Sequence, residues 1–288
     1  MLTLVINFET MKKLLSPIDF SEVSLNALEF AVAIGEKENS NLTLLNIYTP
    51  KDFNSILSSE HVQEEYDTLL DMAESKLKAI SKEILKVSKK KGLLSCDYKL
   101  KSGKIADVLA ELAKKDKCGL IVMGTTGHSA YERKYIGGNA ASIIQHTQCS
   151  VLCVPENSNF HGISKIVYAT DYQEEDKLAI QQLVALAKVL DAKVEVLHVS
   201  HHDDTIDKAM YEEFKGELLS FVHYSKISFN RIVFKHVAQG LDEYMKETDA
   251  DLLVLLNKKL NFLKSLFHKS LTQHLDKFTD YPLMILKL

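Results

Sequence analysis

The sequence predicts an α/β protein of two doubly wound, Rossmann-like domains, each built on a five-stranded parallel sheet. Three observations support this fold class. The chain has 288 residues, which suits about two domains of roughly 150 residues each. Short runs of Val, Ile and Leu alternate with amphipathic stretches, which is typical of βαβ units with strands covered on both faces. An internal repeat divides the chain into two halves.

The repeat places the individual strands and helices. Three pairs of segments carry it: 12–19 with 164–171, 41–47 with 192–199, and 118–124 with 251–257. The first pair is separated by 152 residues and the last by 133, so the second copy is about 19 residues shorter. Between these runs, apolar residues at helical spacing predict helices over 24–38 and 176–190. Ser21, with Ser24, is the expected N-cap of the first helix.

A polar stretch at 156–162, after Pro155, is the expected boundary between domains 11–156 and 163–288. Residues 1–10 have no counterpart in the second half and are either an extension from a mis-assigned start or a real N-terminal strand. Each half ends in a short apolar strand, at 151–154 and 283–286. Pairing of these two edges would protect both from aggregation. We therefore expect a pseudo-two-fold tandem.

The composition limits the classes of binding partner and the cellular compartments that the sequence predicts. Lys and Arg total 35 against 39 Asp and Glu, a formal net charge of −4, which gives no general attraction to nucleic acid or anionic lipid. No apolar run approaches the roughly 18 residues of a membrane span. The four cysteines form no CxxC pair, which argues against a disulfide framework or zinc site. The sequence thus predicts a cytoplasmic protein with reduced thiols, no nucleic-acid partner and no membrane insertion.

The main chemical signal is a glycine loop. Gly124 and Gly127 follow the apolar run 120–123, and after nine residues Gly137 and Gly138 precede a helical pattern over 140–146. In an open parallel sheet, ligands bind beyond the carboxyl ends of the strands, and glycines let backbone N–H groups approach phosphate oxygens. The loop matches neither the P-loop nor the dinucleotide fingerprint. It predicts an anion site, whereas the alternative is a glycine turn kept only for close helix packing.

These residues resemble the universal stress protein family in its tandem form. The family's glycine spacing falls on Gly124, Gly127 and Gly137, its strand ends match 17–21 and 44–47, and its last helix and strand match 146–155. The resemblance implies an adenine nucleotide alpha hydrolase-like fold that binds ATP or a related adenine nucleotide, with or without Mg. It also implies the binding residues: Pro17, Asp19, Ile47, Met123, Gly124, Gly127, His128, Gly137, Gly138 and Asn139.

Two departures from the family pattern weaken this expectation. Gly138 replaces the Ser or Thr whose hydroxyl would contact phosphate, and one neutral hydrogen bond is worth about 0.5–1.5 kcal/mol, so ATP binding should weaken without being lost. Asn139 or Thr125 could partly substitute. In the second half no glycine occurs from 241 to 288, and a solvated basic loop is expected there instead of a phosphate cradle.

The remaining signals are weaker. His198, His201 and His202 are low-ranking candidates for a metal site, and solvated loop residues are the alternative. No known catalytic motif is present, so at most slow ATP hydrolysis is expected. The leading hypothesis is a stress-response regulator that binds adenine nucleotide in its first domain. The alternative is an interaction scaffold or small-ligand carrier of the same family. A homodimer is possible in either case, and the sequence names no protein partner.

Overall fold

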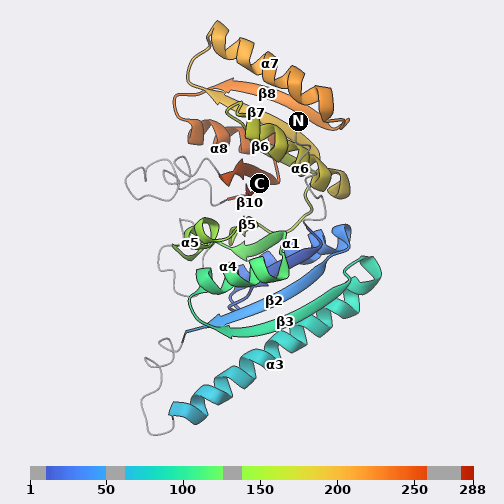
Figure 1. The fold of residues 1–288 in the computed structure, drawn as a ribbon, viewed down its shortest axis with the longest axis vertical. Coiled ribbons are helices and arrows are strands. Elements are labelled where there is room, and N and C mark those ends of the chain that lie inside the picture. Colours follow the sequence, from blue (N-terminus) through green and yellow to red (C-terminus); the bar gives the residue numbers. More distant parts are fainter. Residues whose placement is uncertain (1–10, 50–61, 126–137, 258–279) are drawn as a thin grey trace. The chain divides into compact units, whose positions relative to one another are not determined.

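A computed structural model describes residues 11–49, 62–125, 138–257 and 280–288. The chain divides into two compact units, unit 1 ending at Glu156 and unit 2 continuing from Asn157 (Figure 1). Each unit is an α/β structure and is described by itself. Within the described residues, no helix is both long enough and apolar enough to cross a membrane.

Unit 1 is a parallel sheet with strand order β3-β2-β1-β4-β5. The chain moves from β1 to β3 in one direction and then reverses, so right-handed crossovers place α1 and α3 on one face and α4 and α5 on the other. Helices α1 and α3 contact each other, as do α4 and α5. The elements are β1 (Lys13–Pro17), α1 (Glu22–Glu38), β2 (Asn41–Tyr48), α3 (Val62–Ser88), η2 (Lys89–Lys91), β3 (Ser95–Ser102), α4 (Ile105–Asp116), β4 (Leu120–Gly124), α5 (Gly138–His146) and β5 (Ser150–Val154).

Unit 2 repeats this arrangement, with strand order β10-β9-β6-β7-β8 and parallel pairing of its described neighbours. Its elements are β6 (Lys165–Ala169), α6 (Glu174–Leu190), β7 (Lys193–Ser200), α7 (Thr205–Phe221), β8 (Ile227–Val233), α8 (Val237–Thr248), β9 (Leu252–Leu256) and β10 (Leu283–Leu286). The predicted fold class, two doubly wound domains with five-stranded parallel sheets, is confirmed.

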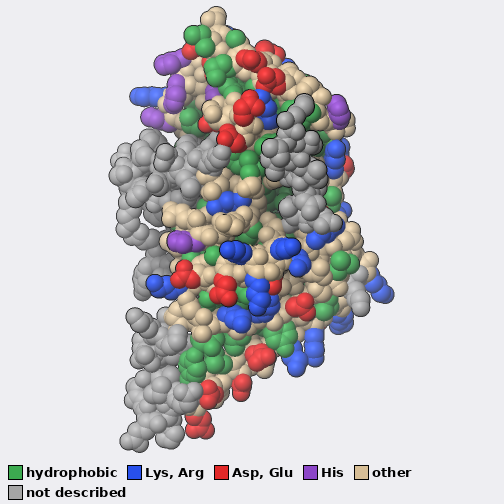
Figure 2. Space-filling view, in the orientation of Figure 1, with side chains coloured by type: hydrophobic (Ala, Val, Ile, Leu, Met, Phe, Trp, Pro, Cys, Tyr) green, Lys and Arg blue, Asp and Glu red, His purple; other side chains and the backbone are tan. Residues whose placement is uncertain are grey.

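The core of each unit lies on both faces of the central strands. All residues of β5 and β9 are buried, and in β4 only Gly124 is not. This explains why these strands read as continuous apolar runs without alternation. Most charged side chains are on the surface, although a few, such as Asp176 and Asp242, are buried. Figure 2 shows basic and acidic groups interspersed over one face of the molecule.

The structure confirms the repeat but corrects its register near the end. Strand β1 places Leu14 opposite Leu120, and the equivalent Ile166 lies opposite Leu252. The offset there is 132 residues, not 133, so the second copy is 20 residues shorter and Leu256 is the counterpart of Gly124. The sequence comparison was wrong by one residue because apolar runs buried on both faces carry no alternation to fix their register.

Helix starts agree with capping chemistry. The Ser21 hydroxyl accepts a hydrogen bond from the Ser24 amide at 3.2 Å, which confirms Ser21 as the N-cap of α1. In unit 2, Gln173 and Asp176 form a capping box at the start of α6. Helix α5 begins at Gly138, two residues before the predicted start. Residues 1–10, including the candidate N-terminal strand, lie outside the described part of the chain.

Candidate functional site

The candidate site in unit 1 lies at the carboxyl edge of the sheet, where β1, β2 and β4 end. Parallel pairing brings Pro17 of β1 opposite Leu45 of β2, and β4 ends beside them at Gly124 (Figure 1). The pairing also brings Ile47, near the end of β2, to this edge, where it is half-buried. Residues far apart in sequence therefore meet at the edge where doubly wound folds bind ligands.

The turn between β1 and α1 holds the carboxylate of Asp19. Its Oδ1 accepts hydrogen bonds from the Ser21 amide at 3.0 Å and the Ser21 hydroxyl at 2.5 Å. Phe20, between them, has a φ of 64°, a left-handed conformation that costs a non-glycine residue about 1–2 kcal/mol. The turn fixes Asp19 beside the first turn of α1, where helix amides favour negative charge. Asp19 is exposed, so a ligand can reach it.

Asn46 anchors this turn to the sheet, and the sequence analysis did not identify it. Its Nδ2 donates a hydrogen bond to the Ile18 carbonyl at 2.7 Å, while the Ile18 amide donates to the Leu45 carbonyl at 2.8 Å. At the equivalent position of unit 2, His198 Nδ1 lies 2.9 Å from the Thr170 carbonyl. Asn46 in β2 and His198 in β7 occupy the same position of the repeat, and a polar residue at that position in both strands could have identified this anchor from the sequence.

Gly124 is required for close packing. A Cβ atom at this position would lie 2.6 Å from Val23 Cγ1 and 3.2 Å from the Val23 backbone. The first turn of α1 can therefore approach the end of β4 only if residue 124 is glycine. Pro17 and Met123 are both buried, Met123 with 5% of its surface exposed, so only their backbone is positioned to meet a ligand.

The start of α5 is the open side of the site. Gly138 and Asn139 form its first residues and are exposed, and among the described residues no atom lies within 4 Å of a Cβ at Gly138. Thr125 is only 6% exposed, which leaves Asn139 as the better placed substitute for the expected hydroxyl. Gly127, His128 and Gly137 lie outside the described residues.

The corresponding edge of unit 2 is filled by its own side chains. Tyr172, the counterpart of Phe20, also has a left-handed φ, of 65°. Its ring stacks on His198 with centroids 4.1 Å apart and contacts Phe214 of α7 at 5.5 Å. Aromatic side chains therefore pack against one another at this edge, beside β6 and β7.

A charged cluster at this edge of unit 2 consists of Asp203, Asp207 and Arg231, which lie just before α7, in its first turn and in β8. The Arg231 guanidinium pairs with both carboxylates, through Nε to Asp207 and through Nη1 to Asp203 at 2.8 Å. Burial favours the neutral form of Asp207, but the hydrogen bond from Arg231 and the nearby His198 outweigh it, so the pKa of Asp207 is lowered. His198 Nε2 lies 3.2 Å from Asp207.

The histidines proposed as metal ligands are engaged separately. His198 uses both ring nitrogens within the protein, toward Thr170 and Asp207. His201 is exposed and its Nδ1 lies 3.2 Å from the Lys235 carbonyl, while the His202 carbonyl accepts from Arg231 at 2.9 Å. In the described part of the chain, no group of three His, Cys, Asp or Glu side chains is arranged to hold a metal ion.

Asp171 is the counterpart of Asp19, but its surroundings differ. In unit 2 the neighbouring Asp176 is fully buried and organises the turn. It accepts hydrogen bonds from the Tyr168 and Thr170 hydroxyls at 2.7 and 2.8 Å and from the Asp171 amide at 3.2 Å. The turn of unit 2 is thus built around an internal carboxylate, whereas unit 1 has Ser24 at that position.

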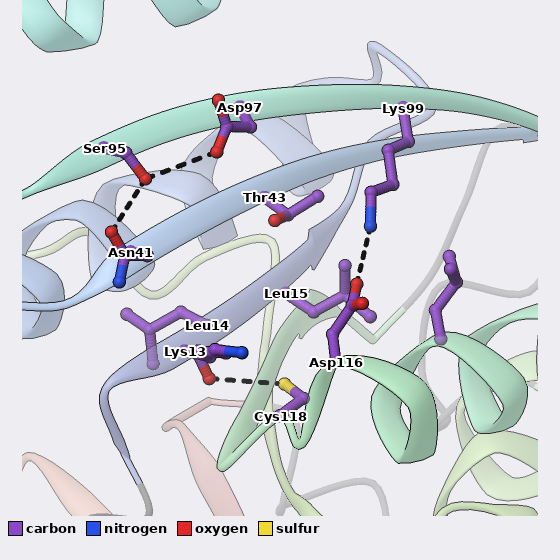
Figure 3. A pocket seen from close by; sticks show the side chains of 11 residues that line it. Lys13, Leu14, Leu15, Asn41, Thr43, Ser95, Asp97, Lys99, Asp116 and Cys118 are labelled. Atoms are coloured by element: carbon purple, nitrogen blue, oxygen red, sulfur yellow. Dashed lines mark hydrogen bonds and ion pairs between the residues drawn. The ribbon is translucent and has the colours of Figure 1, made fainter.

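A pocket of about 340 Å³ lies at the opposite, amino edge of unit 1 (Figure 3). It is lined by residues at the starts of β1, β2 and β3 and by the end of α4. It is therefore separate from the candidate site at the carboxyl edge.

The fold and the site can be compared with known proteins. The model of the Universal stress protein family matches residues 10–155 and 162–287. A universal stress protein of Methanocaldococcus jannaschii is 27% identical over 143 residues, covering 50% of this chain and 81% of the relative. Another, from Synechocystis, is 25% identical over 158 residues, covering 49% of this chain and 96% of the relative.

A solved structure extends the likeness to the whole chain. The crystal structure of a universal stress protein from Archaeoglobus fulgidus has a TM-score of 0.69, with 14% identity, and covers 96% of this chain and 98% of its own. At this identity the likeness shows the fold alone. The family model, by contrast, matches nearly all of the chain in two copies. The chain therefore belongs to the universal stress protein family and carries two of its domains in tandem.

Proposed function

We propose that this protein is a cytoplasmic stress-response regulator that binds ATP or a related adenine nucleotide in unit 1. The observation that carries the proposal is the contrast between the two carboxyl edges. In unit 1, an exposed Asp19 and the exposed first two residues of α5 flank the ends of β1 and β4. In unit 2, the counterpart Asp171 is exposed as well, but the ring of the neighbouring Tyr172 stacks on His198.

The chemistry of unit 1 suits a nucleotide. The amides at the start of α5 favour negative charge, and residue 138 has no Cβ to block the approach of phosphate. The Asp19 carboxylate can accept hydrogen bonds from the hydroxyl and amino groups of an adenosine. Mg²⁺ would be held mainly by the phosphate oxygens, as is usual for this ion.

Equilibrium dialysis of the full chain against ATP tests this proposal, with Asp19→Ala and Asp171→Ala as a matched pair. Both aspartates follow the first strand of their unit at equivalent positions. We expect Asp19→Ala to weaken ATP binding by about tenfold or more, because a charged hydrogen-bond acceptor is lost. Asp171→Ala should leave the affinity unchanged. Equal effects of the two variants would contradict placement of the nucleotide in unit 1.

The second candidate function is an interaction scaffold or carrier that binds no nucleotide. It is favoured by Gly138, which removes the expected hydroxyl, and by the filled edge of unit 2. The same dialysis separates the two, since a scaffold would retain no ATP at millimolar concentration.

A further inference from the structure

Two cysteines that are 31 positions apart in sequence are brought together in unit 1. Cys118 comes two residues before β4 and Cys149 one residue before β5, and these parallel strands pair with Leu120 opposite Ser150. Neighbouring strands of a sheet are about 5 Å apart, so this pairing brings Cys118 and Cys149 to neighbouring positions just before the two strands. The two thiols are hydrogen-bonded to each other, and neither is in a disulfide.

The pocket at the amino edge of unit 1 leads to Cys118. Cys118 lines this pocket, its thiol lies 3.4 Å from the Lys13 carbonyl (Figure 3), and the residue is partly exposed. Cys149 is only 8% exposed. The rest of the lining combines three leucines with polar side chains, and it includes the ion pair between Lys99 and Asp116 at 2.6 Å. A small oxidant can therefore reach Cys118 from this pocket, whereas Cys149 is almost fully covered.

We propose that Cys118 and Cys149 are a modification site, where a hydroperoxide converts the two thiols into a reversible intramolecular disulfide. The Cys118 sulfur attacks a peroxide oxygen, the O–O bond breaks, and water or an alcohol leaves, so that Cys118 becomes a sulfenic acid. The Cys149 sulfur then displaces the hydroxyl from Cys118, the S–S bond forms, and water leaves. Two thiols and one hydroperoxide thus give one disulfide, one water and one alcohol or second water, by transfer of two electrons to the peroxide.

The local chemistry sets the rate of this oxidation. The hydrogen bond with Cys149 and burial raise the pKa of Cys118 well above its usual range. Because the thiolate is the nucleophile, the reaction is slow at neutral pH and accelerates as the pH rises. The site therefore responds to sustained oxidant, unlike sensor cysteines whose pKa is lowered.

The disulfide would tie together the two ends of segment 118–149, which contains β4 and α5. Closing a loop of this length removes conformational freedom mainly from the unfolded chain. We expect the oxidised protein to melt several degrees higher than the reduced protein.

The test uses the full chain treated with hydrogen peroxide, then denatured, alkylated and mapped by mass spectrometry. The matched control is the double variant Cys96→Ser and Cys153→Ser, which removes the thiols that are 2% and 0% exposed. After peroxide treatment, the wild type and the double variant should each have two fewer alkylatable thiols and a mass lower by two hydrogens. Each should give one peptide that links Cys118 to Cys149, and dithiothreitol should restore the reduced form. The rate should rise between about pH 7 and about pH 9.

A second variant tests the order of events without requiring the disulfide. In Cys149→Ser, peroxide should leave a sulfenic acid on Cys118 that a 1,3-diketone traps. The proposal is overturned if Cys118 and Cys149 both remain alkylatable in the treated wild type, or if the link joins two chains. It is also overturned if another cysteine supplies the second sulfur. Mapping of the wild type alone decides these outcomes if a variant fails to fold.

Discussion

Restoring a hydroxyl at position 138 should tighten nucleotide binding. In Gly138→Ser the new Cβ would meet no atom of the described residues within 4 Å, so the substitution introduces no clash with that part of the chain. Position 138 is the first residue of α5, where a serine hydroxyl can donate to a phosphate oxygen. One added hydrogen bond of about 0.5–1.5 kcal/mol corresponds to an affinity gain of up to about tenfold.

The matched control is Gly138→Ala, which fills the same space without a donor. Calorimetric titration of both variants and the wild type with ATP should place serine tightest and leave alanine close to glycine. The reasoning is refuted if serine binds no more tightly than alanine, since the hydroxyl would then make no contact with the ligand.

Three further predictions concern the packing and charges at the two edges. Gly124→Ala should destabilise unit 1 by about 1–3 kcal/mol in denaturant unfolding, because its Cβ would press on Val23; stability equal to that of the wild type would contradict the close packing. Tyr172→Ala should lower the free energy of unfolding of unit 2 by about 2 kcal/mol or more. Tyr172→Phe should leave it unchanged, because the Tyr172 hydroxyl has no hydrogen-bond partner among the described residues. Equal destabilisation by the two variants would contradict a stabilising role of the ring stacking. The pKa of Asp207 is lowered in the folded state. The Asp207 carboxylate therefore stabilises the fold at pH values above its ordinary pKa near 3.8, and this stabilisation disappears as the pH falls through the folded-state pKa. Asp207→Asn should therefore flatten the loss of stability below about pH 4, and an unchanged pH profile would contradict the pairing with Arg231.

The sequence was sufficient for the fold but not for every register. Apolar runs and the helical spacing between them predicted the parallel sheets, because strands covered on both faces have to be apolar throughout. The same property hid the one-residue shift of β9, which only the pairing of Ile166 with Leu252 revealed. Ser21 was predicted as an N-cap because capping depends on local sequence alone.

The candidate site was predictable only in part. The glycine spacing located the edge of unit 1, and Asp19 lies there exposed. The aromatic packing at the edge of unit 2 involves Tyr172, His198 and Phe214, which come from three separate segments. No local sequence pattern predicts that these side chains contact one another. The thiol pair was missed for the same reason, because pairing of parallel strands, not sequence spacing, brings Cys118 to Cys149.

We propose that the tandem chain has a single nucleotide site, in unit 1. Calorimetric titration of the full-length chain with ATP measures this stoichiometry directly. We expect one nucleotide per chain, with binding weakened by Asp19→Ala. Two equivalent sites per chain, or one site that is insensitive to Asp19→Ala and lost in Asp171→Ala, would contradict it.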